Sequence, residues 1–315
     1  MPSTKIPKSF QQDGQDLISK INSLIAKAVK SKFDGNPSRH PLLFVNAVKN
    51  IIGDDRENPS IKLLNLSDKY INQFSSRNDD DKILDNIIKE GIGLTVFVED
   101  VEVAIMSGIK EEAELEAAKQ LLASDKSEAI LECLAELALH DIEVMGLFTY
   151  HWMRSYQFHH DKELLWAYTM SMINEIFKAN LQNHAEFNFP KYQNLISTFL
   201  NKCSQKNVST FSSMNRLWSD DYVRTLHFQT LISSWLEKWT HEHIVNSEMD
   251  VKELNNYTKN GGSYFIELAE NIYDNNDINI SVNKIIELEG LRGLVKKATS
   301  ESFSRIAQCI NLTVD

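Results

Sequence analysis

Three side chains of this sequence have types and spacing that could support chemistry: Glu136, His140 and Glu143. Spacings of four and three residues place them on one side of an α-helix, where carboxylate and imidazole groups can converge on one metal ion or relay a proton. A further ligand would come from the following helix, from His184 or Glu175. The sequence therefore predicts a candidate metal site of Glu136, His140, Glu143 and His184, with iron or another transition metal as its cofactor.

The same pattern has a simpler interpretation without a cofactor. Ferritin-like bundles use a Glu-x-x-His pair on each of two helices, and zincins use His-Glu-x-x-His, and the sequence contains neither pattern. A charged stripe at helical spacing is also typical of the solvated face of a surface helix. In that case His151, Trp152 and Arg154, which follow on the same segment, are candidate contacts to a partner.

Two long helices are needed to position these residues. Apolar residues recur at three- and four-residue spacings from Ile130 to Trp152, which predicts one amphipathic helix that begins near Asp125. A second helix is predicted to begin near Asp161, after His159 and His160. Consecutive helices joined by a short polar turn pack as an antiparallel hairpin, so we expect a long central hairpin with an aromatic core.

The composition indicates an all-α fold. Of the 315 residues, 42% are hydrophobic and 24% are charged, as in soluble globular proteins. Only 11 glycines and 6 prolines are present, which leaves little turn material for many short strands. We expect an irregular multi-helix bundle of about ten or more helices, since no fixed internal repeat occurs.

Two segments bear on the domain organisation and on the local structure. The serine-rich segment Ser204–Asn215 is predicted to be a linker, which would divide the chain into a bundle over 1–203 and a helical subdomain over 216–315; one continuous domain is the alternative.

Residues 92–106 fit both a helix and a strand, and the helical neighbours favour a helix. Gly290 and Gly293, in the predicted last helix, indicate a bend or a close crossing with another helix.

Charge and segment composition set aside several functional classes. A net charge of −11 opposes binding to the phosphates of nucleic acids. No apolar run is long enough for a membrane span or a secretory leader, so a cytoplasmic location is expected. Three cysteines without a metal-binding spacing, Cys133, Cys203 and Cys309, are expected to be packing residues.

Two functional hypotheses remain, because the sequence contains no phosphate-binding loop, dinucleotide-binding glycine pattern or nucleophile elbow. The first is a non-enzymatic protein-binding protein, an adaptor, regulator or toxin-neutralising partner, whose acidic surface favours a basic protein partner. The alternative is a metal-dependent bundle enzyme of the non-haem iron type that uses the Glu/His face. A pocket lined by the five tryptophans is a third, minor possibility, for which core packing is the simpler explanation.

Overall fold

The computed structural model describes residues 8–93, 96–179, 192–243 and 249–315. Within these ranges the protein is built from helices and contains no β-strand, which confirms the all-α fold class. In chain order the helices are α1 (Lys8–Val29), η1 (Pro37–Arg39), α2 (Pro41–Ile52), α3 (Ile61–Ile71), α4 (Lys82–Glu90), α5 (Val98–Ser107), α6 (Lys110–Ala123), α7 (Ala129–Ala138), η2 (Leu139–Asp141), η3 (Ile142–Gly146), α8 (Leu147–His159), η4 (Lys162–Leu164), α9 (Leu165–Ala179), α10 (Leu195–Phe199), η5 (Leu200–Lys202), η6 (Gln205–Asn207), α11 (Val208–Trp218), α12 (Thr225–Leu236), α13 (Lys252–Asn260), α14 (Tyr264–Asn275), α15 (Ile278–Val295), η7 (Ser300–Ser302) and α16 (Phe303–Val314).

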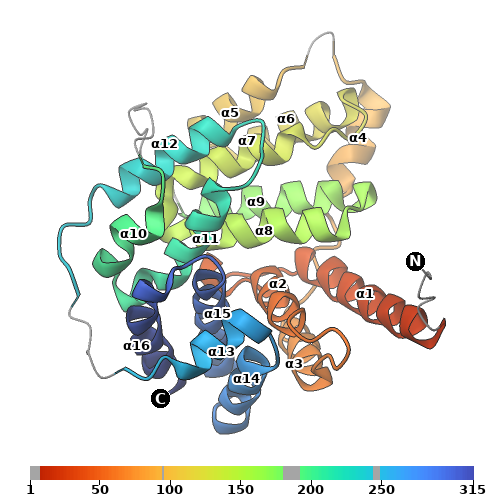
Figure 1. The fold of residues 1–315 in the computed structure, drawn as a ribbon. Helices are drawn as coiled ribbons and strands as arrows, with labels where there is room; N and C mark the ends of the chain where they lie inside the picture. Colours follow the sequence, from red (N-terminus) through yellow and green to blue (C-terminus); the bar gives the residue numbers. More distant parts are fainter. Residues whose placement is uncertain (1–7, 94–95, 180–191, 244–248) are drawn as a thin grey trace, which may run out of the picture.

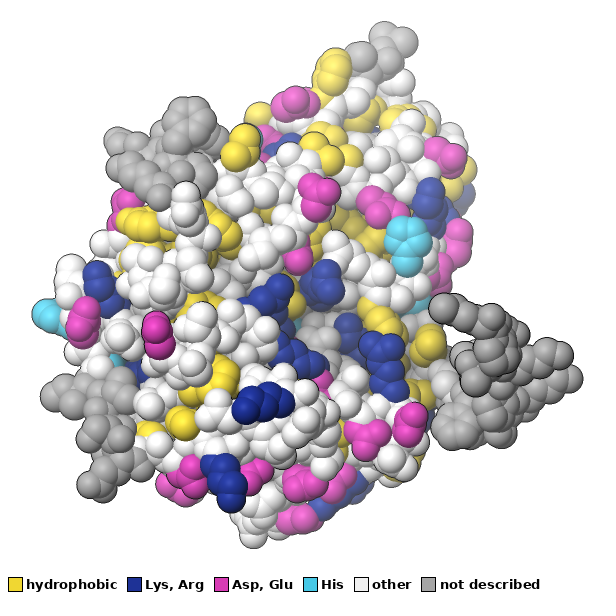
Figure 2. Space-filling view, in the orientation of Figure 1, with side chains coloured by type: hydrophobic (Ala, Val, Ile, Leu, Met, Phe, Trp, Pro, Cys, Tyr) yellow, Lys and Arg dark blue, Asp and Glu magenta, His cyan; other side chains and the backbone are white. Residues whose placement is uncertain are grey.

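Helices α8 and α9 cross the middle of the molecule, as Figure 1 shows. Helices α4 to α7 and α12 cover one side of this pair, and α1 to α3 together with α13 to α16 lie on the other side (Figure 1). In the same orientation, Figure 2 shows hydrophobic and acidic side chains close together over the upper part of the molecule, the part that α5 and α6 occupy.

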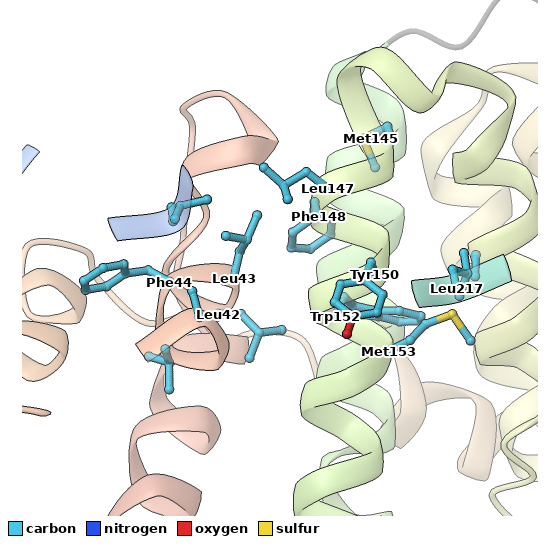
Figure 3. Packing of buried hydrophobic residues seen from close by; sticks show 14 of the residues in the cluster. Leu42, Leu43, Phe44, Met145, Leu147, Phe148, Tyr150, Trp152, Met153 and Leu217 are labelled. Atoms are coloured by element: carbon cyan, nitrogen blue, oxygen red, sulfur yellow. The ribbon is translucent and has the colours of Figure 1, made fainter. Parts of the chain in front are cut away.

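The largest packed contact around α8 is made by α2. Figure 3 shows Leu42, Leu43 and Phe44 of α2 on one side and Leu147 and Phe148 of α8 on the other. All these side chains are buried. Helix α2 begins where it does because Pro41 suits the first helical position and the His40 side chain accepts a hydrogen bond from the Leu42 backbone N–H.

Helices α8 and α9 contact each other through hydrogen bonds as well as rings. The Trp152 Nε1–H group donates to the Tyr168 carbonyl at 3.1 Å and to Ser171 Oγ at 3.0 Å. The Tyr168 hydroxyl lies 3.1 Å from Ser155 Oγ. A residue further along α8 thus contacts a residue earlier on α9, so the two helices run in opposite directions.

The segment predicted as one helix from Asp125 to Trp152 is interrupted twice. Helix α7 begins only at Ala129, because Asp125 and Lys126 have left-handed φ values of 53° and 58°. Between α7 and α8 the chain forms a 3₁₀ turn and one π-helical turn. Asp141 leaves the helical region there, with φ −121° and ψ 78°, and its carboxylate accepts a hydrogen bond from the Val144 backbone N–H. The helical periodicity assumed from Glu136 to Arg154 is therefore broken.

The prediction of a linker at Ser204–Asn215 is wrong, because most of it forms α11. This helix packs against α8 and α15, and its small polar residues Ser209, Ser212 and Ser213 are buried. Ser209 contacts Gly290 so closely that a Cβ atom on Gly290 would lie 2.8 Å from the Ser209 Cα atom. The predicted close crossing at Gly290 is therefore present, and the boundary drawn between 203 and 216 runs through a packed helix.

Two further expectations concern helix α5 and the cysteines. The helix favoured for residues 92–106 is confirmed from Val98 onward, while Ile92 and Gly93 precede it without helical structure. The three cysteines are buried and free of disulfide bonds, as expected of packing residues. Among the described residues, no helix is both long and apolar enough to cross a membrane.

Candidate functional site

Glu136, the first residue of the predicted metal site, contacts Arg224, in the turn before α12, and His227, on α12. Its Oε2 atom lies 2.6 Å from Arg224 Nη1, and its Oε1 atom lies 2.7 Å from His227 Nδ1. Arg224 Nη1 also lies 2.9 Å from Glu102 Oε1 on α5, and the Arg224 backbone N–H donates to Glu132. These carboxylates therefore hold the start of α12 against α5 and α7.

Glu143 and His140 lie on the interrupted segment between α7 and α8. Glu143 is exposed and pairs with Lys206 at 3.1 Å, whereas His140 is half-buried in the 3₁₀ turn. Glu136 and Glu143 thus pair with different cations on different elements. In the described part of the chain, no three His, Cys, Asp or Glu residues are grouped so that they could hold a metal ion. His184 lies outside the described residues, so the four-residue metal site stays a prediction.

The predicted binding residues occupy different environments. His151 and Trp152 are completely buried, because α2, α9 and α11 surround this part of α8. The assignment of His151 to a solvated stripe is therefore wrong, and neither side chain can touch a partner in this structure. Arg154 is exposed and lies 3.7 Å from Asp220, so it alone of the three is available at the surface.

A buried polar network that the sequence did not reveal connects α2, α8, α11 and α15. The carboxylate of Glu289, on α15, accepts two hydrogen bonds from Arg216 and one from Asn50, and lies 3.5 Å from His151 Nε2. Burial alone would raise the pKa of Glu289, but Arg216 outweighs it and holds that pKa well below its usual range. Asn46 donates to His151 Nδ1 at 2.8 Å.

The network continues along α15 towards the surface. Arg292 makes two hydrogen bonds to Asp54, and the carboxylate of Asp54 also accepts one from the Tyr257 hydroxyl. Although burial acts in the opposite direction, these partners lower the pKa of Asp54. Every charged group named here has an opposite charge or a donor beside it, so the network holds these helices together.

The surface of α4, α5 and α6 carries an uncommon combination of apolar and acidic side chains. Thirteen large hydrophobic side chains are exposed among the described residues, and six of them lie between residues 88 and 115. We call this region the α4–α6 surface; its exposed hydrophobic residues are Ile88, Phe97, Val103, Met106, Ile109 and Leu115. Helices α4 and α5 both pack against α6, and exposed apolar side chains gathered on neighbouring helices are typical of an interaction site.

The same stretch carries most of the net charge of the protein. Residues 85–116 contain nine Asp or Glu and two Lys residues, which amounts to −7 of the total of −11. On α5, Glu99, Val103 and Met106 are spaced four and three residues apart, and all three are exposed, so acidic and apolar groups share one face. Glu111, Glu112 and Leu115 repeat this arrangement on α6.

Arg224 links this surface to the start of α12. Because Arg224 pairs with Glu102, the residues next to Arg224 lie beside α5. Two of its neighbours, Val223 and Leu226, are exposed by 95% and 58%, which extends the apolar surface beyond α6. Exposed apolar side chains are therefore present on α4, α5 and α6 and also at the start of α12, which begins more than a hundred residues after the end of α6.

Comparison with known proteins gives no relative for this chain: no family model, curated protein or solved structure matches it.

Proposed function

We propose that this protein is a non-enzymatic binding protein whose α4–α6 surface binds a basic, amphipathic helical segment of another protein. The observation that carries the proposal is the coincidence of exposed apolar side chains with a local charge of −7 over residues 85–116. An amphipathic helix supplies apolar side chains at three- and four-residue spacing, which match the spacing of Val103 and Met106.

Charge complementarity selects the partner. Lys and Arg residues beside the apolar stripe of the partner would pair with Glu99, Glu111 and Glu112 at the rim of the surface. Nucleic acids and anionic lipid surfaces carry the same sign of charge as this region and are repelled by it. A basic protein segment is therefore the class of partner that satisfies both the apolar and the acidic groups.

The partner can be sought by photo-crosslinking in the organism from which the gene comes. A photoreactive amino acid at Val103 or Met106 would lie inside the interface, and one at Leu312, which is 59% exposed on α16, serves as the matched control. We expect one basic protein to be crosslinked from positions 103 and 106 and not from position 312. Crosslinks from position 312 alone, or identical products from all three positions, would contradict the proposal.

A further inference from the structure

A cleft between the start of α6 and the end of α9 has features of a ligand site. It has a volume of about 370 Å³ and lies between the chain that follows α1, the segment before α4, the start of α6 and the end of α9. It opens into a wider outer cleft of about 680 Å³, with which it shares Lys32, Arg77, Lys110 and Asn174. The cleft is therefore large enough for a small molecule and open enough for one to enter.

The lining of the inner cleft is positively charged although the protein is acidic. Four cations, Lys32, Arg77, Lys110 and Lys178, face two carboxyl groups, those of Asp34 and Glu175. Because Arg77 and Lys110 also pair with Asp80 and Glu114 in the outer cleft, the cations outnumber all these carboxylates only when Glu175 is neutral. A local excess of positive charge then attracts anions against the net charge of the whole molecule.

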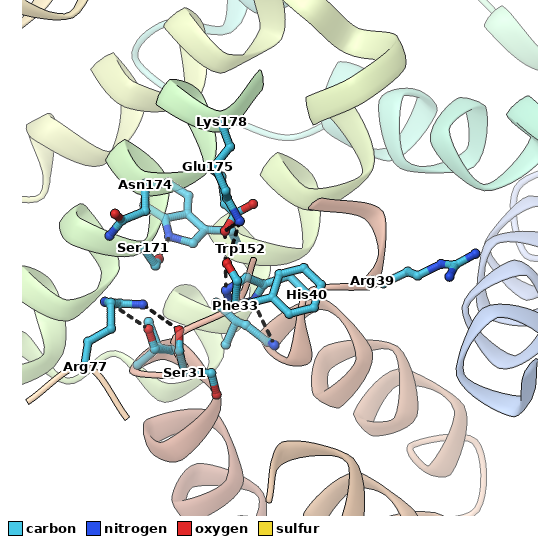
Figure 4. Close-up of polar contacts among 12 residues, drawn as sticks. Ser31, Phe33, Arg39, His40, Arg77, Trp152, Ser171, Asn174, Glu175 and Lys178 are labelled. Atoms are coloured by element: carbon cyan, nitrogen blue, oxygen red, sulfur yellow. Dashed lines mark hydrogen bonds and ion pairs between the residues drawn. The ribbon is translucent and has the colours of Figure 1, made fainter. Parts of the chain in front are cut away.

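Two of the cations are held in place by neutral acceptors. Arg77 donates to the carbonyl oxygens of Val29, Ser31 and Ala167, and Lys110 donates to the Asn174 side chain at 2.6 Å. These hydrogen bonds to neutral groups fix the two side chains in place, and Figure 4 shows those of Arg77 as dashed lines. Each of these two cations also has a carboxylate partner in the outer cleft: Asp80 lies 2.9 Å from Arg77, and Glu114 lies 3.4 Å from Lys110.

Glu175 lies at the buried end of this cleft with one oxygen unsatisfied. Its side chain is 2% exposed, its Oε1 atom lies 2.7 Å from Lys178 Nζ, and its Oε2 atom has no hydrogen-bond partner among the residues that the structure describes. Lys178 Nζ also donates to the Phe33 carbonyl at 2.6 Å (Figure 4). Lys178 is thus shared between a carboxyl group and the cleft.

His40 faces Glu175 from the N-terminus of α2. Its Nε2 atom lies 3.9 Å from Glu175 Oε1, and its Nδ1 atom accepts the Leu42 N–H, so the ring hydrogen is on Nε2. Burial, Arg77 and Lys178 lower the pKa of His40 well below its usual value, so this ring stays neutral near neutral pH. The charged groups that act on Glu175 are therefore Lys178, Arg77 and Asp34.

We propose that this cleft binds a small oxyanion, of the sulfate and phosphate class, and that protonation of Glu175 strengthens binding by releasing Lys178 from its ion pair. With Glu175 neutral, Asp34 is the one carboxylate left among the residues that line the inner cleft. The ammonium group of Lys178 can then form an ion pair with the bound oxyanion. Burial raises the pKa of Glu175 to about 7, although Lys178 and Arg77 lower it, so this change takes place near neutral pH.

The direction of the pH effect follows from the same groups. Glu175 is protonated below pH 7 and ionised above it, so oxyanion affinity rises as the pH falls. For a single group with this pKa, affinity increases about tenfold between about pH 8 and about pH 6.

Calorimetric titration of the full chain with sodium sulfate at these two pH values tests the proposal, because sulfate keeps the same charge over this range. We expect wild-type protein to bind sulfate about tenfold more tightly at the lower pH. Glu175→Gln should bind equally tightly at both pH values, because its side chain cannot ionise. Lys178→Met should lose binding, whereas Lys20→Met, which removes a lysine from the exposed side of α1, should not.

Three results would overturn the proposal: no sulfate binding at either pH, an affinity that is the same at both pH values in the wild type, or equal affinities of Lys178→Met and Lys20→Met. If Lys178→Met fails to fold, as judged by circular dichroism, Lys110→Met replaces it with the same expected loss of binding. Sodium chloride at matched ionic strength separates specific oxyanion binding from general screening.

Discussion

Arg216 and Glu289 form a bidentate ion pair in the interior of the protein. Arg216 Nη1 lies 2.5 Å from Glu289 Oε1, and Arg216 Nη2 lies 2.9 Å from Glu289 Oε2. The Glu289 side chain is fully buried, and the Arg216 guanidinium lies over the ring of Tyr150 at 4.3 Å. The pair joins α11 to α15, beside the crossing at Gly290. It is therefore a structural link on which the position of α11 depends.

Removing one member of this pair should destabilise the protein strongly. Glu289→Ala leaves the Arg216 charge buried without a partner, so we expect the free energy of unfolding to fall by about 3–5 kcal/mol in urea denaturation. Glu143→Ala breaks an exposed pair with Lys206 and should change stability by less than about 1 kcal/mol. A similar small effect of both substitutions would contradict the assigned role of the buried pair.

His151 should make the protein sensitive to mild acid. Burial, the largest effect, lowers the pKa of His151 to about 3, although Glu289 raises it. An unfolded histidine has a pKa near 6.5, so between about pH 3 and 6.5 the unfolded state binds the extra proton and stability falls as the pH falls. His151→Gln removes this contribution.

The stability advantage of wild type over His151→Gln should therefore shrink by about 1.4 kcal/mol for each pH unit below about 6. Urea denaturation of both proteins across this range measures the difference between their free energies of unfolding. The contributions of other titrating groups are the same in both proteins and cancel in this difference. A difference that stays constant from neutral pH to about pH 5 would show that His151 is not held neutral in the folded state.

Gly290 should tolerate no side chain. An alanine Cβ there would lie 2.8 Å from the Ser209 Cα atom, which is backbone and cannot move aside alone. We expect Gly290→Ala to lower stability by about 1–3 kcal/mol through a forced separation of α11 and α15. Gly14, on α1, has no heavy atom of the described part of the chain within 4 Å of its Cβ position, so Gly14→Ala should instead raise stability by about 0.5–1 kcal/mol. Thermal denaturation of the two variants side by side distinguishes the effects, and equal melting temperatures would contradict the close crossing.

The sequence predicts the fold class because the amphipathic periodicity and the scarcity of glycine and proline are local properties of the chain. It also indicates a bend or a close crossing at Gly290 and Gly293, of which the crossing is present, but it does not indicate the partner helix. The partner is α11, whose serine-rich sequence is typical of a loop. Ser209 and Ser212 are small enough for α15 to approach closely, but small residues stabilise α11 only because α15 packs against it. Local composition therefore predicted a linker in place of a central helix.

The buried polar network is harder to predict because its residues come from distant parts of the chain. Arg216 and Glu289 are separated by 73 residues, and His151 meets Asn46 across 105. The predicted stripe of Glu136, His140 and Glu143 assumed one regular helix, and the turns at Leu139–Gly146 break it. The α4–α6 surface, in contrast, has a sequence signal: the excess of acidic residues over 85–116 next to Val103 and Met106.

The most direct test of the proposed function is the affinity of the crosslinked partner for the double variant Val103→Glu/Met106→Glu, measured by calorimetric titration. Both side chains are exposed, so the fold should be unaffected, and Leu312→Glu is the matched control. If the α4–α6 surface is the binding site, the double variant should bind at least about tenfold more weakly than wild type, because loss of apolar anchors costs more than 1 kcal/mol. Affinity that is unchanged in the double variant, or reduced equally in Leu312→Glu, would contradict it.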